Sequence, residues 1–182
     1  MASTLLTKYT KEIVPALKAE FSLANNFQVP RLVKIVVNTG LGIALTDPKI
    51  HEQAKKAIAQ ITGQMPLKTL SRKSVAGFKL REGVAIGQKV TLRGERMYDF
   101  FEKFVQVALP RVRDFRGIQS KSIDPNGNLS IGLAEQTIFP EIKVEEVERP
   151  IPLSVTIVTS GTKNRDLARK LYEKFGIPFS KE

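Results

Sequence analysis

The segment SRKSVAGFKLREGVAIG, residues 71–87, combines four cationic side chains with three glycines and one aromatic ring, Phe78. Lysine and arginine attract phosphates, and an exposed aromatic ring can stack on a nucleobase. Glycine lets a backbone approach another surface closely. Taken alone, the segment leaves two interpretations open. It is either a nucleic-acid-binding loop or a solvated hairpin whose Phe78 folds back into the core.

The residues that follow favour nucleic-acid binding. The alternation in AIGQKVTLR predicts a half-buried strand over residues 85–93, with Lys89, Thr91 and Arg93 on its polar side. A β-branched run predicts another strand over residues 31–38. On that strand Lys34 and Asn38 share one face.

Cations and small hydrogen-bonding groups from several elements could therefore form one surface. Asn38, Gln64 and Thr91 can bond to base edges or 2′-hydroxyls, while lysine and arginine supply long-range attraction. The predicted RNA-binding residues are Lys34, Asn38, Gln64, Phe78, Lys89, Thr91 and Arg93.

The charge supports a polyanionic partner. The chain of 182 residues has 29 Lys and Arg against 18 Asp and Glu, a net charge of +11. Residues 68–96 hold 8 basic and 2 acidic side chains, so net +6 lies in this short region. A charge that served only solubility would be spread more evenly.

Enzyme and metal chemistry find little support. The chain has no cysteine and a single histidine, His51, which removes thiolate sites, cysteine nucleophiles and multi-histidine sites. The segment NTGLGIA contains Gly-x-Gly, but Leu45 stands where a dinucleotide loop needs its third glycine. We expect no enzyme, no cofactor and no metal.

Two other functions stay open as alternatives to the binding of one specific RNA. One is a nucleotide-dependent enzyme built around NTGLG, and the other is a general single-stranded nucleic-acid chaperone. The acidic stretch EIKVEEVE, residues 141–148, is interpreted as a solvated face or a docking patch for a basic partner.

The elements that must position these residues alternate between helices and hairpins. We expect helices over residues 4–21, 47–63, 95–109 and 164–175, and strands over 31–38, 67–70, 85–93, 129–133 and 153–160. This order predicts an α+β fold, with a largely antiparallel sheet, helices packed on one face and a polar surface facing RNA. The length suits a single domain over residues 1–182.

No apolar run reaches the roughly 18 to 20 residues that span a membrane. The N-terminal segment also lacks a signal-peptide pattern. We therefore expect a cytoplasmic chain.

Several long motifs carry a family resemblance. VPRLVKIVVNTGLG, GQMPLKTLSRKSVAGFKLREGVAIGQKVTLRGERMYDFF, LPRVRDFRG and IFPEI together resemble the bacterial large-subunit ribosomal protein family that carries the number five. The resemblance covers nearly the whole chain. Met65 departs from it, because the family usually has a basic residue at that position.

The resemblance implies a structural protein of the central protuberance that binds 5S rRNA through Asn38, Gln64, Phe78 and Thr91. It also implies that a loop over residues 71–83 approaches the elbow of the peptidyl-site tRNA. The loop residues that would face this tRNA are Arg72, Lys73, Ser74, Lys79 and Arg81.

By the same resemblance, an intersubunit bridge would join the chain to a basic protein of the small-subunit head. The bridge residues expected here are Arg111, Arg113, Arg116 and Glu141. The other implied partner is large-subunit rRNA, with no membrane contact and no homo-oligomer.

Overall fold

The structure, a computed structural model, describes residues 4–42, 47–143, 145, 147, 149–160, 162 and 164–180. The chain forms two compact units. The first unit comprises Met1–Ile35, Leu92–Ile131 and Thr156–Glu182, and the second comprises Val36–Thr91 and Gly132–Val155. One domain over residues 1–182 stays a prediction.

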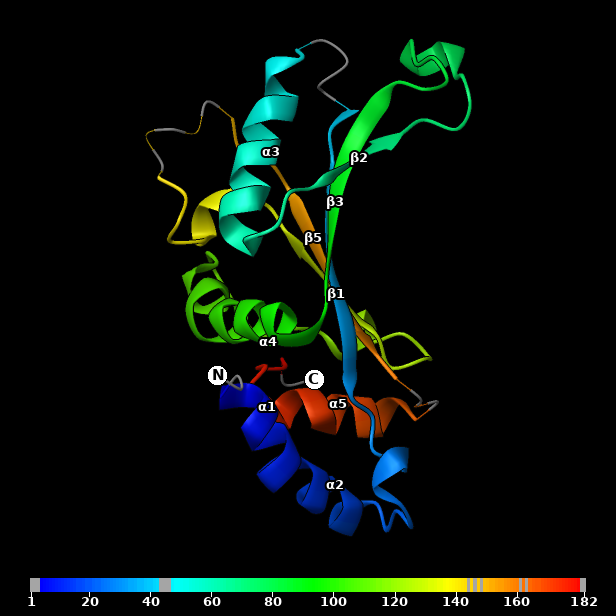
Figure 1. The fold of residues 1–182 in the computed structure, drawn as a ribbon, viewed down its shortest axis with the longest axis vertical. Helices are drawn as coiled ribbons and strands as arrows, with labels where there is room; N and C mark the ends of the chain where they lie inside the picture. Colours follow the sequence, from blue (N-terminus) through cyan, green and yellow to red (C-terminus); the bar gives the residue numbers. More distant parts are fainter. Residues whose placement is uncertain are drawn as a thin grey trace. The chain divides into compact units, whose positions relative to one another are not determined.

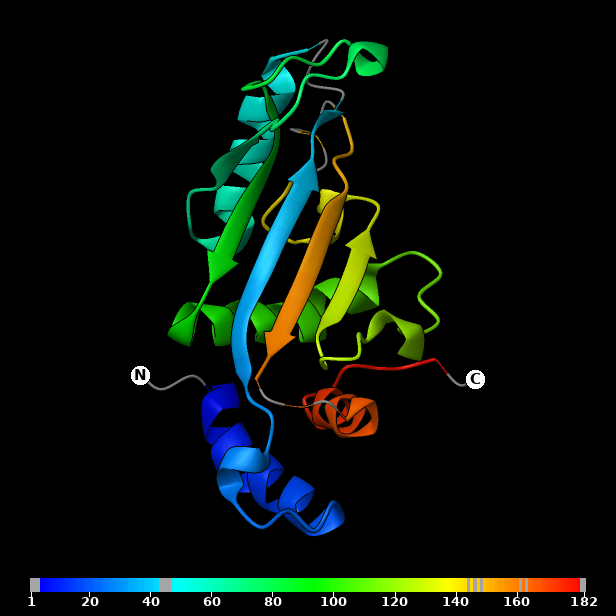
Figure 2. The same ribbon diagram turned by 90° about the vertical axis from the view of Figure 1, so that its right-hand side faces the viewer.

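Five strands form one antiparallel sheet in the order β2-β3-β1-β5-β4 (Figures 1 and 2). Together with the helices, this confirms the predicted α+β class. The strands are β1 (Leu32–Gly40), β2 (Leu67–Leu70), β3 (Ala85–Leu92), β4 (Leu129–Leu133) and β5 (Leu153–Thr159).

The β2–β3 hairpin is antiparallel, with Leu67 opposite Lys89 and Thr69 opposite Gly87. The register shifts after Thr69. Such an irregularity bends a strand, and it lies where the chain leaves the sheet for the basic loop.

In the second unit, helix α3 (Lys49–Thr62) covers one face of the hairpin strands (Figure 2). The predicted helix ends are confirmed. The Asp47 carboxylate accepts the Lys49 amide at 3.1 Å, and Gly63, at a φ of 67°, donates its amide to the Ala59 carbonyl at 2.9 Å. The buried stripe of the helix consists of Ile50, Ala54, Ala57, Ile58 and Ile61.

Two side-chain hydrogen bonds join α3 to β3, and one of them lies between the His51 Nε2 and the Ala85 carbonyl at 3.1 Å. The buried Gln88 amide nitrogen donates to the His51 carbonyl at 2.7 Å. Gln88 therefore faces the helix, and its neighbours in β3 face the opposite side.

The first unit begins with a helical segment of three parts. Helix α1 (Thr4–Lys8) continues as a π-helical turn (Tyr9–Ile13) and then as α2 (Val14–Glu20). Pro15 lies in the first turn of α2, where its missing N–H costs little. The α-helix thus restarts beside this proline, whereas the sequence predicted one helix over residues 4–21.

Two further helices complete the first unit. Helix α4 (Gly94–Lys103) runs on through a π-helical turn (Phe104–Ala108) and a 3-10 turn (Leu109–Arg111). Helix α5 (Arg165–Lys174) is capped by Asn164, whose side-chain oxygen accepts the backbone amides of Asp166 and Leu167. Among the described residues, no helix is long and apolar enough to cross a membrane.

The core of the first unit is rich in aromatic rings. Phe175 stacks on Tyr9 at 5.9 Å between ring centroids and meets the edge of Phe101 at 5.3 Å. The Tyr172 hydroxyl, which is fully buried, donates to the Gly127 carbonyl at 2.9 Å. Burial raises the pKa of this hydroxyl.

Candidate nucleic-acid interface

A closed loop joins β2 to β3 (Figure 1). At its base the Ser71 amide donates to the Val84 carbonyl at 2.8 Å, and the Gly83 amide donates to the Ser71 carbonyl at 3.0 Å. The buried Ser71 hydroxyl donates to the Lys73 carbonyl at 2.7 Å. These bonds hold the two ends of the loop together.

The loop tip is a tight hairpin of its own. Val75 and Leu80 exchange backbone hydrogen bonds of 2.9 and 3.1 Å around the 3-10 turn Ala76–Phe78. Lys79 then takes a left-handed φ of 50°, which reverses the chain. Phe78 lies on this turn with 76% of its surface exposed. The interpretation in which Phe78 folds back into the core is therefore wrong.

The same loop carries several exposed polar side chains. All five residues predicted to face tRNA are exposed: Arg72, Lys73, Ser74, Lys79 and Arg81. The Ser74 hydroxyl also accepts the Glu82 amide at 3.0 Å, which ties the two arms of the loop together. The loop thus presents four exposed cations and one exposed aromatic ring on a hydrogen-bonded frame.

Three predicted residues meet on the sheet face that points away from α3. In β3, Lys89 is exposed and Thr91 half-buried, whereas Gln88 and Val90 are buried on the helix side. In β1, Asn38 is exposed between two buried neighbours. By the alternation of strand side chains, Asn38, Lys89 and Thr91 share the open face (Figure 2).

A glycine keeps the strands close on this face. A Cβ at Gly87 would lie 2.6 Å from the Thr39 carbonyl oxygen and 2.8 Å from the Thr69 hydroxyl oxygen. Since these distances are far below van der Waals contact, any side chain at Gly87 would push the backbone apart. The close packing of the strands at this point therefore requires a glycine.

The structure adds exposed apolar side chains that sequence reasoning missed. Met65, Leu67 and Leu70 are 69%, 66% and 58% exposed. Leu67 stands opposite Lys89 and so lies on the open face. The sequence held a signal for this exposure. Positions 67 and 70 fall on opposite faces of a strand, so Leu67 and Leu70 cannot both be buried in one core.

Gln64 lies in the connection between α3 and β2. It is half-buried, and its backbone is held to Thr62, whose hydroxyl donates to the Gln64 carbonyl at 3.1 Å.

Two other predicted residues belong to the first unit. Lys34 is half-buried in β1, Arg93 is exposed just before α4, and their part in the same surface stays a prediction.

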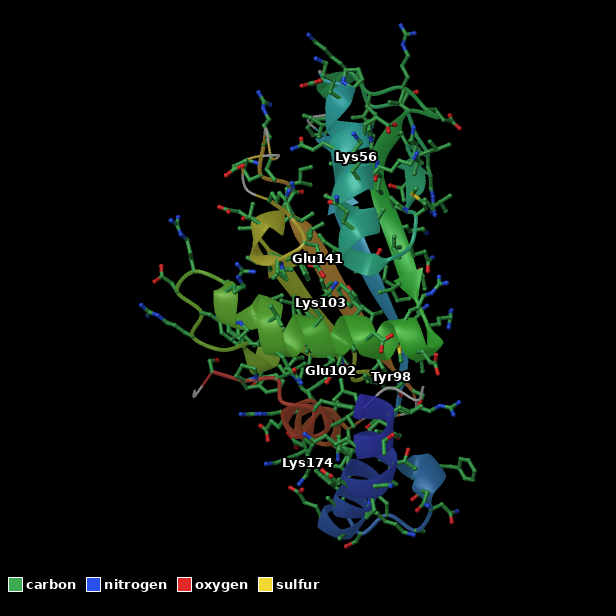
Figure 3. The ribbon with its side chains drawn as sticks, turned by 60° about the vertical axis from the view of Figure 1, so that its left-hand side comes forward. Lys56, Tyr98, Glu102, Lys103, Glu141 and Lys174 are labelled. Atoms are coloured by element: carbon green, nitrogen blue, oxygen red, sulfur yellow. The ribbon has the colours of Figure 1, made fainter. Side chains whose placement is uncertain are left out.

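The predicted bridge residues are all exposed but belong to different units. Arg111, Arg113 and Arg116 lie in the first unit, on the connector after α4. Glu141 lies in the second unit, in the loop after the 3-10 turn Gln136–Ile138 (Figure 3).

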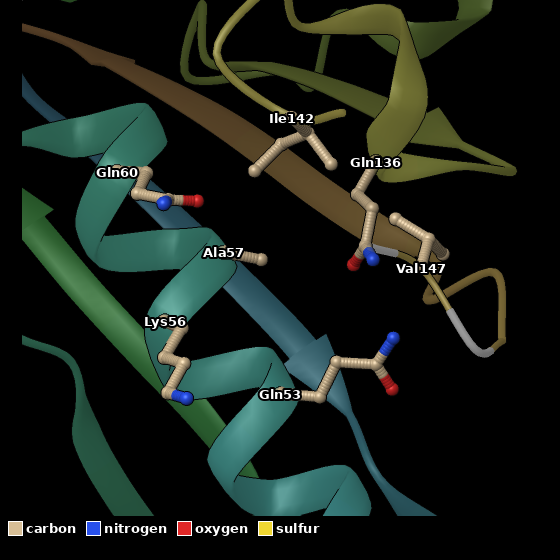
Figure 4. Close-up of a pocket in the computed structure, with 7 residues that line it drawn as sticks. All are labelled: Gln53, Lys56, Ala57, Gln60, Gln136, Ile142 and Val147. Carbon is tan, nitrogen blue, oxygen red and sulfur yellow. The ribbon is translucent and has the colours of Figure 1, made fainter. Parts of the chain in front are cut away.

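That loop flanks α3 around a small polar cavity of about 80 Å³ (Figure 4). Gln136 is 1% exposed, and its amide atoms have no hydrogen-bond partner among the described residues. The cavity is lined by Gln53, Lys56, Ala57, Gln60, Gln136, Ile142 and Val147. The loop that carries Glu141 thus lies on the α3 side of the second unit, away from Asn38 and Lys89.

In the segment NTGLGIA, which was compared with a dinucleotide loop, Thr39 makes a hydrogen bond within the fold. The Thr39 hydroxyl donates to the Pro152 carbonyl at 2.8 Å, which ties the end of β1 to the start of β5. Leu45 lies outside the described residues. Within the described ranges, no group of three or more potential metal ligands occurs.

Comparison with known proteins gives two family matches. The family model "Ribosomal protein L5" matches residues 25–81, and the model "ribosomal L5P family C-terminus" matches residues 85–179. The large ribosomal subunit protein uL5 of Mesoplasma florum is 51% identical over 181 residues. The uL5 proteins of Latilactobacillus sakei subsp. sakei and Lactobacillus delbrueckii subsp. bulgaricus are 50% and 48% identical. Each match covers 100% of both chains.

Proposed function

Because this chain belongs to the uL5 family of large-ribosomal-subunit proteins, we propose that it binds 5S rRNA through the loop and open face of its second unit. It is a structural ribosomal protein. Its role would be to attach 5S rRNA to the central protuberance, in contact with large-subunit rRNA.

The observation that carries this proposal is the exposed ring of Phe78 on a loop that also carries four exposed cations. A phenylalanine at 76% exposure gains nothing from the protein core, so its position serves a surface contact. An RNA base offers the flat π-surface that such a ring can stack on, and the four cations would neutralise the adjacent phosphates.

The open face would add selectivity. The Asn38 amide and the Thr91 hydroxyl can bond to base edges or 2′-hydroxyls, and Gln64 lies at the neighbouring turn. Exposed Leu67 would pack against a ribose or base beside the Lys89 contact to phosphate.

Two further contacts belong to the proposal. The loop tip, with Arg72, Lys73 and Lys79, would meet the elbow of the peptidyl-site tRNA. Glu141 on the α3 side, together with the first unit's Arg111, Arg113 and Arg116, would contribute to a bridge with a basic small-subunit head protein. The exposure of all these side chains supports both contacts.

Titration of the purified chain into 5S rRNA at several salt concentrations tests the proposal. Six phosphate contacts, the number suggested by the net +6 of residues 68–96, predict a log–log slope of roughly −4 to −5. A flat salt response would reject the electrostatic mechanism.

An unrelated RNA of equal length serves as the specificity control. Equal affinity for both RNAs would favour the nucleic-acid chaperone instead. Calorimetry with nucleotides tests the enzyme alternative, for which we expect no binding heat.

A further inference from the structure

We propose that Phe27, on the turn that precedes β1, stacks on an unpaired nucleotide of ribosomal RNA, which gives the first unit an RNA contact of its own. The inference rests on the proposed RNA-binding function and extends it to a unit that holds none of the loop. Phe27 was not among the residues predicted from the sequence.

Phe27 is almost completely exposed. The chain has ten phenylalanines, all within the described residues, and only Phe27 and Phe78 are exposed. Phe27 reaches 98%, more than the 76% of Phe78. Both rings lie on short 3-10 turns. A phenylalanine so fully in solvent contributes almost nothing to folding through burial.

The turn that carries Phe27 is held in place from both sides. The Gln28 amide donates to the Asn25 carbonyl at 3.1 Å, and the Gln28 side chain accepts the Ala24 amide at 3.1 Å. Immediately afterwards Val29 and Pro30 are buried, and the Tyr9 hydroxyl donates to the Pro30 carbonyl at 3.2 Å. The ring is thus presented on a fixed backbone, which lowers the entropy lost on binding.

The surroundings of the ring favour a nucleotide over a protein groove. Asn25, Asn26 and Gln28 are all exposed, so Phe27 stands alone among amides and forms no apolar patch with its neighbours. A docking surface for protein would bring several apolar side chains together. One aromatic ring beside side-chain amides offers stacking and base-edge hydrogen bonds, the combination that recognises unpaired bases.

Charge supports the same occupant. The first unit holds 18 Lys and Arg against 10 Asp and Glu, a net charge of +8. A positively charged unit attracts phosphate at long range, and the ring would then hold a base at short range.

Photo-crosslinking identifies what covers the ring. The full-length chain with Phe27→p-benzoylphenylalanine is assembled into large ribosomal subunits and irradiated, and the adduct is treated with ribonuclease. We expect an adduct that ribonuclease trims. Mapping the modified nucleotide then distinguishes 5S rRNA from large-subunit rRNA, and either source supports the proposal. An adduct to another protein or to a second copy of this chain, or no adduct, would overturn it.

Substitutions test whether the ring itself acts by stacking. Phe27→Ala should speed dissociation of the chain from assembled subunits on the order of tenfold, as expected for the loss of one stacked base. Phe27→Leu should behave like Phe27→Ala, while Phe27→Trp should dissociate like the unchanged chain. A leucine that fully replaces the ring would show apolar packing rather than stacking and would contradict the proposal.

Phe78→Ala, measured on free 5S rRNA, keeps the two proposals separate. If that change has no effect while the Phe27 adduct is RNA, the proposed site in the second unit fails and the inference on Phe27 stands. Because Phe27 is exposed, its variants should melt at the same temperature as the unchanged chain, which a thermal scan checks.

Discussion

The two units differ in how they arrange charge. The first unit carries a net charge of +8, and the second carries only +3, from 11 basic and 8 acidic side chains. Yet the second unit holds the loop that carries four exposed cations and the exposed Phe78. Of its exposed acids, Glu135, Glu141 and Glu145 lie in a separate segment of the chain, while the loop itself holds one, Glu82.

This difference shows that net charge alone does not locate a binding surface. Seven of the second unit's eight acidic residues lie outside the loop, so a small net charge still leaves a strongly cationic loop. The first unit instead combines a larger net charge with one isolated ring. The proposed contact to 5S rRNA therefore depends on the second unit's loop, and the following experiments test that assignment.

The largest effect is expected from removal of the loop cations. A variant with Arg72→Ala, Lys73→Ala, Lys79→Ala and Arg81→Ala should flatten the log–log salt slope of 5S rRNA binding by roughly 3 to 4. Affinity at low salt should fall by roughly 100-fold or more, because four counterion-releasing contacts are lost.

The matched control removes three cations from α3, with Lys49→Ala, Lys55→Ala and Lys56→Ala. It should change the slope far less, since these residues belong to the helix that covers the opposite face. An equal loss in both variants would mean that RNA responds to overall charge and not to the loop.

Removal of the exposed ring of the second unit should have the next largest effect. Phe78→Ala should weaken 5S rRNA binding by ~1 to 3 kcal/mol, and Phe78→Trp should preserve it, because stacking needs an aromatic face. Circular dichroism should show an intact fold, since Phe78 is exposed. Unchanged affinity in the folded alanine variant would remove stacking from the mechanism.

The close approach at Gly87 should be visible in stability. Gly87→Ala should lower the free energy of unfolding by ~1 to 3 kcal/mol, because the new Cβ collides with the Thr39 carbonyl oxygen. Gly132→Ala in β4 is the control, since a Cβ there meets nothing within 4 Å. Denaturant unfolding measures both, and equal stability of the two variants would mean that the strands can separate at no cost.

The first unit should be sensitive to a buried hydroxyl. Tyr172→Phe removes one of the two hydroxyls that donate to the buried Gly127 carbonyl, the other being that of Thr159, and should cost ~0.5 to 1.5 kcal/mol of unfolding free energy for the lost hydrogen bond. Tyr9→Phe should cost less, since its hydrogen bond to Pro30 is only part-buried and 3.2 Å long. RNA affinity should stay unchanged in both. A loss of affinity without a loss of stability would assign these tyrosines to the RNA site.

The smallest effect on stability near neutral pH is expected from the ionisation of the tyrosines. An alkaline titration of these side chains reports on the first unit alone. All three tyrosines lie there, and burial raises the pKa of each, that of Tyr9 to about 12, where the nearby Tyr98 also raises it. A raised tyrosine pKa stabilises the fold fully below the ordinary value of 10.0, and this stability is lost as pH rises toward 12.

Tyrosinate absorbance against pH, recorded with circular dichroism, checks this prediction. We expect little tyrosinate at pH 10 while the chain stays folded. A midpoint near 10 in the folded chain would contradict the burial of these hydroxyls.

Local signals predicted most of the secondary structure. The helix over residues 47–63 follows from Asp47 and Gly63, and β3 follows from its alternation, because both signals act within a few residues. Phe78 could not be placed from the sequence. Its exposure depends on the bonds that close the loop between Ser71 and Gly83.

Longer-range arrangements were not predictable either. The turn that carries Phe27 is followed by Pro30, whose carbonyl accepts the hydroxyl of Tyr9, 21 residues earlier in the chain. The buried amide of Gln136 needs the packing of its loop on α3. The division of the sheet between two units likewise arises from contacts that no local pattern contains.

Strand β2 has one further consequence. It is the last strand of the sheet order, and among the described residues no other strand pairs with its outer edge. Leu67 and Leu70 on this strand are exposed, with Lys68 between them. Newly made chains that accumulate without RNA would therefore tend to pair edge to edge and aggregate, with Lys68 as the main local protection. When cells make this chain in excess over rRNA, the excess should appear in the insoluble fraction of the lysate.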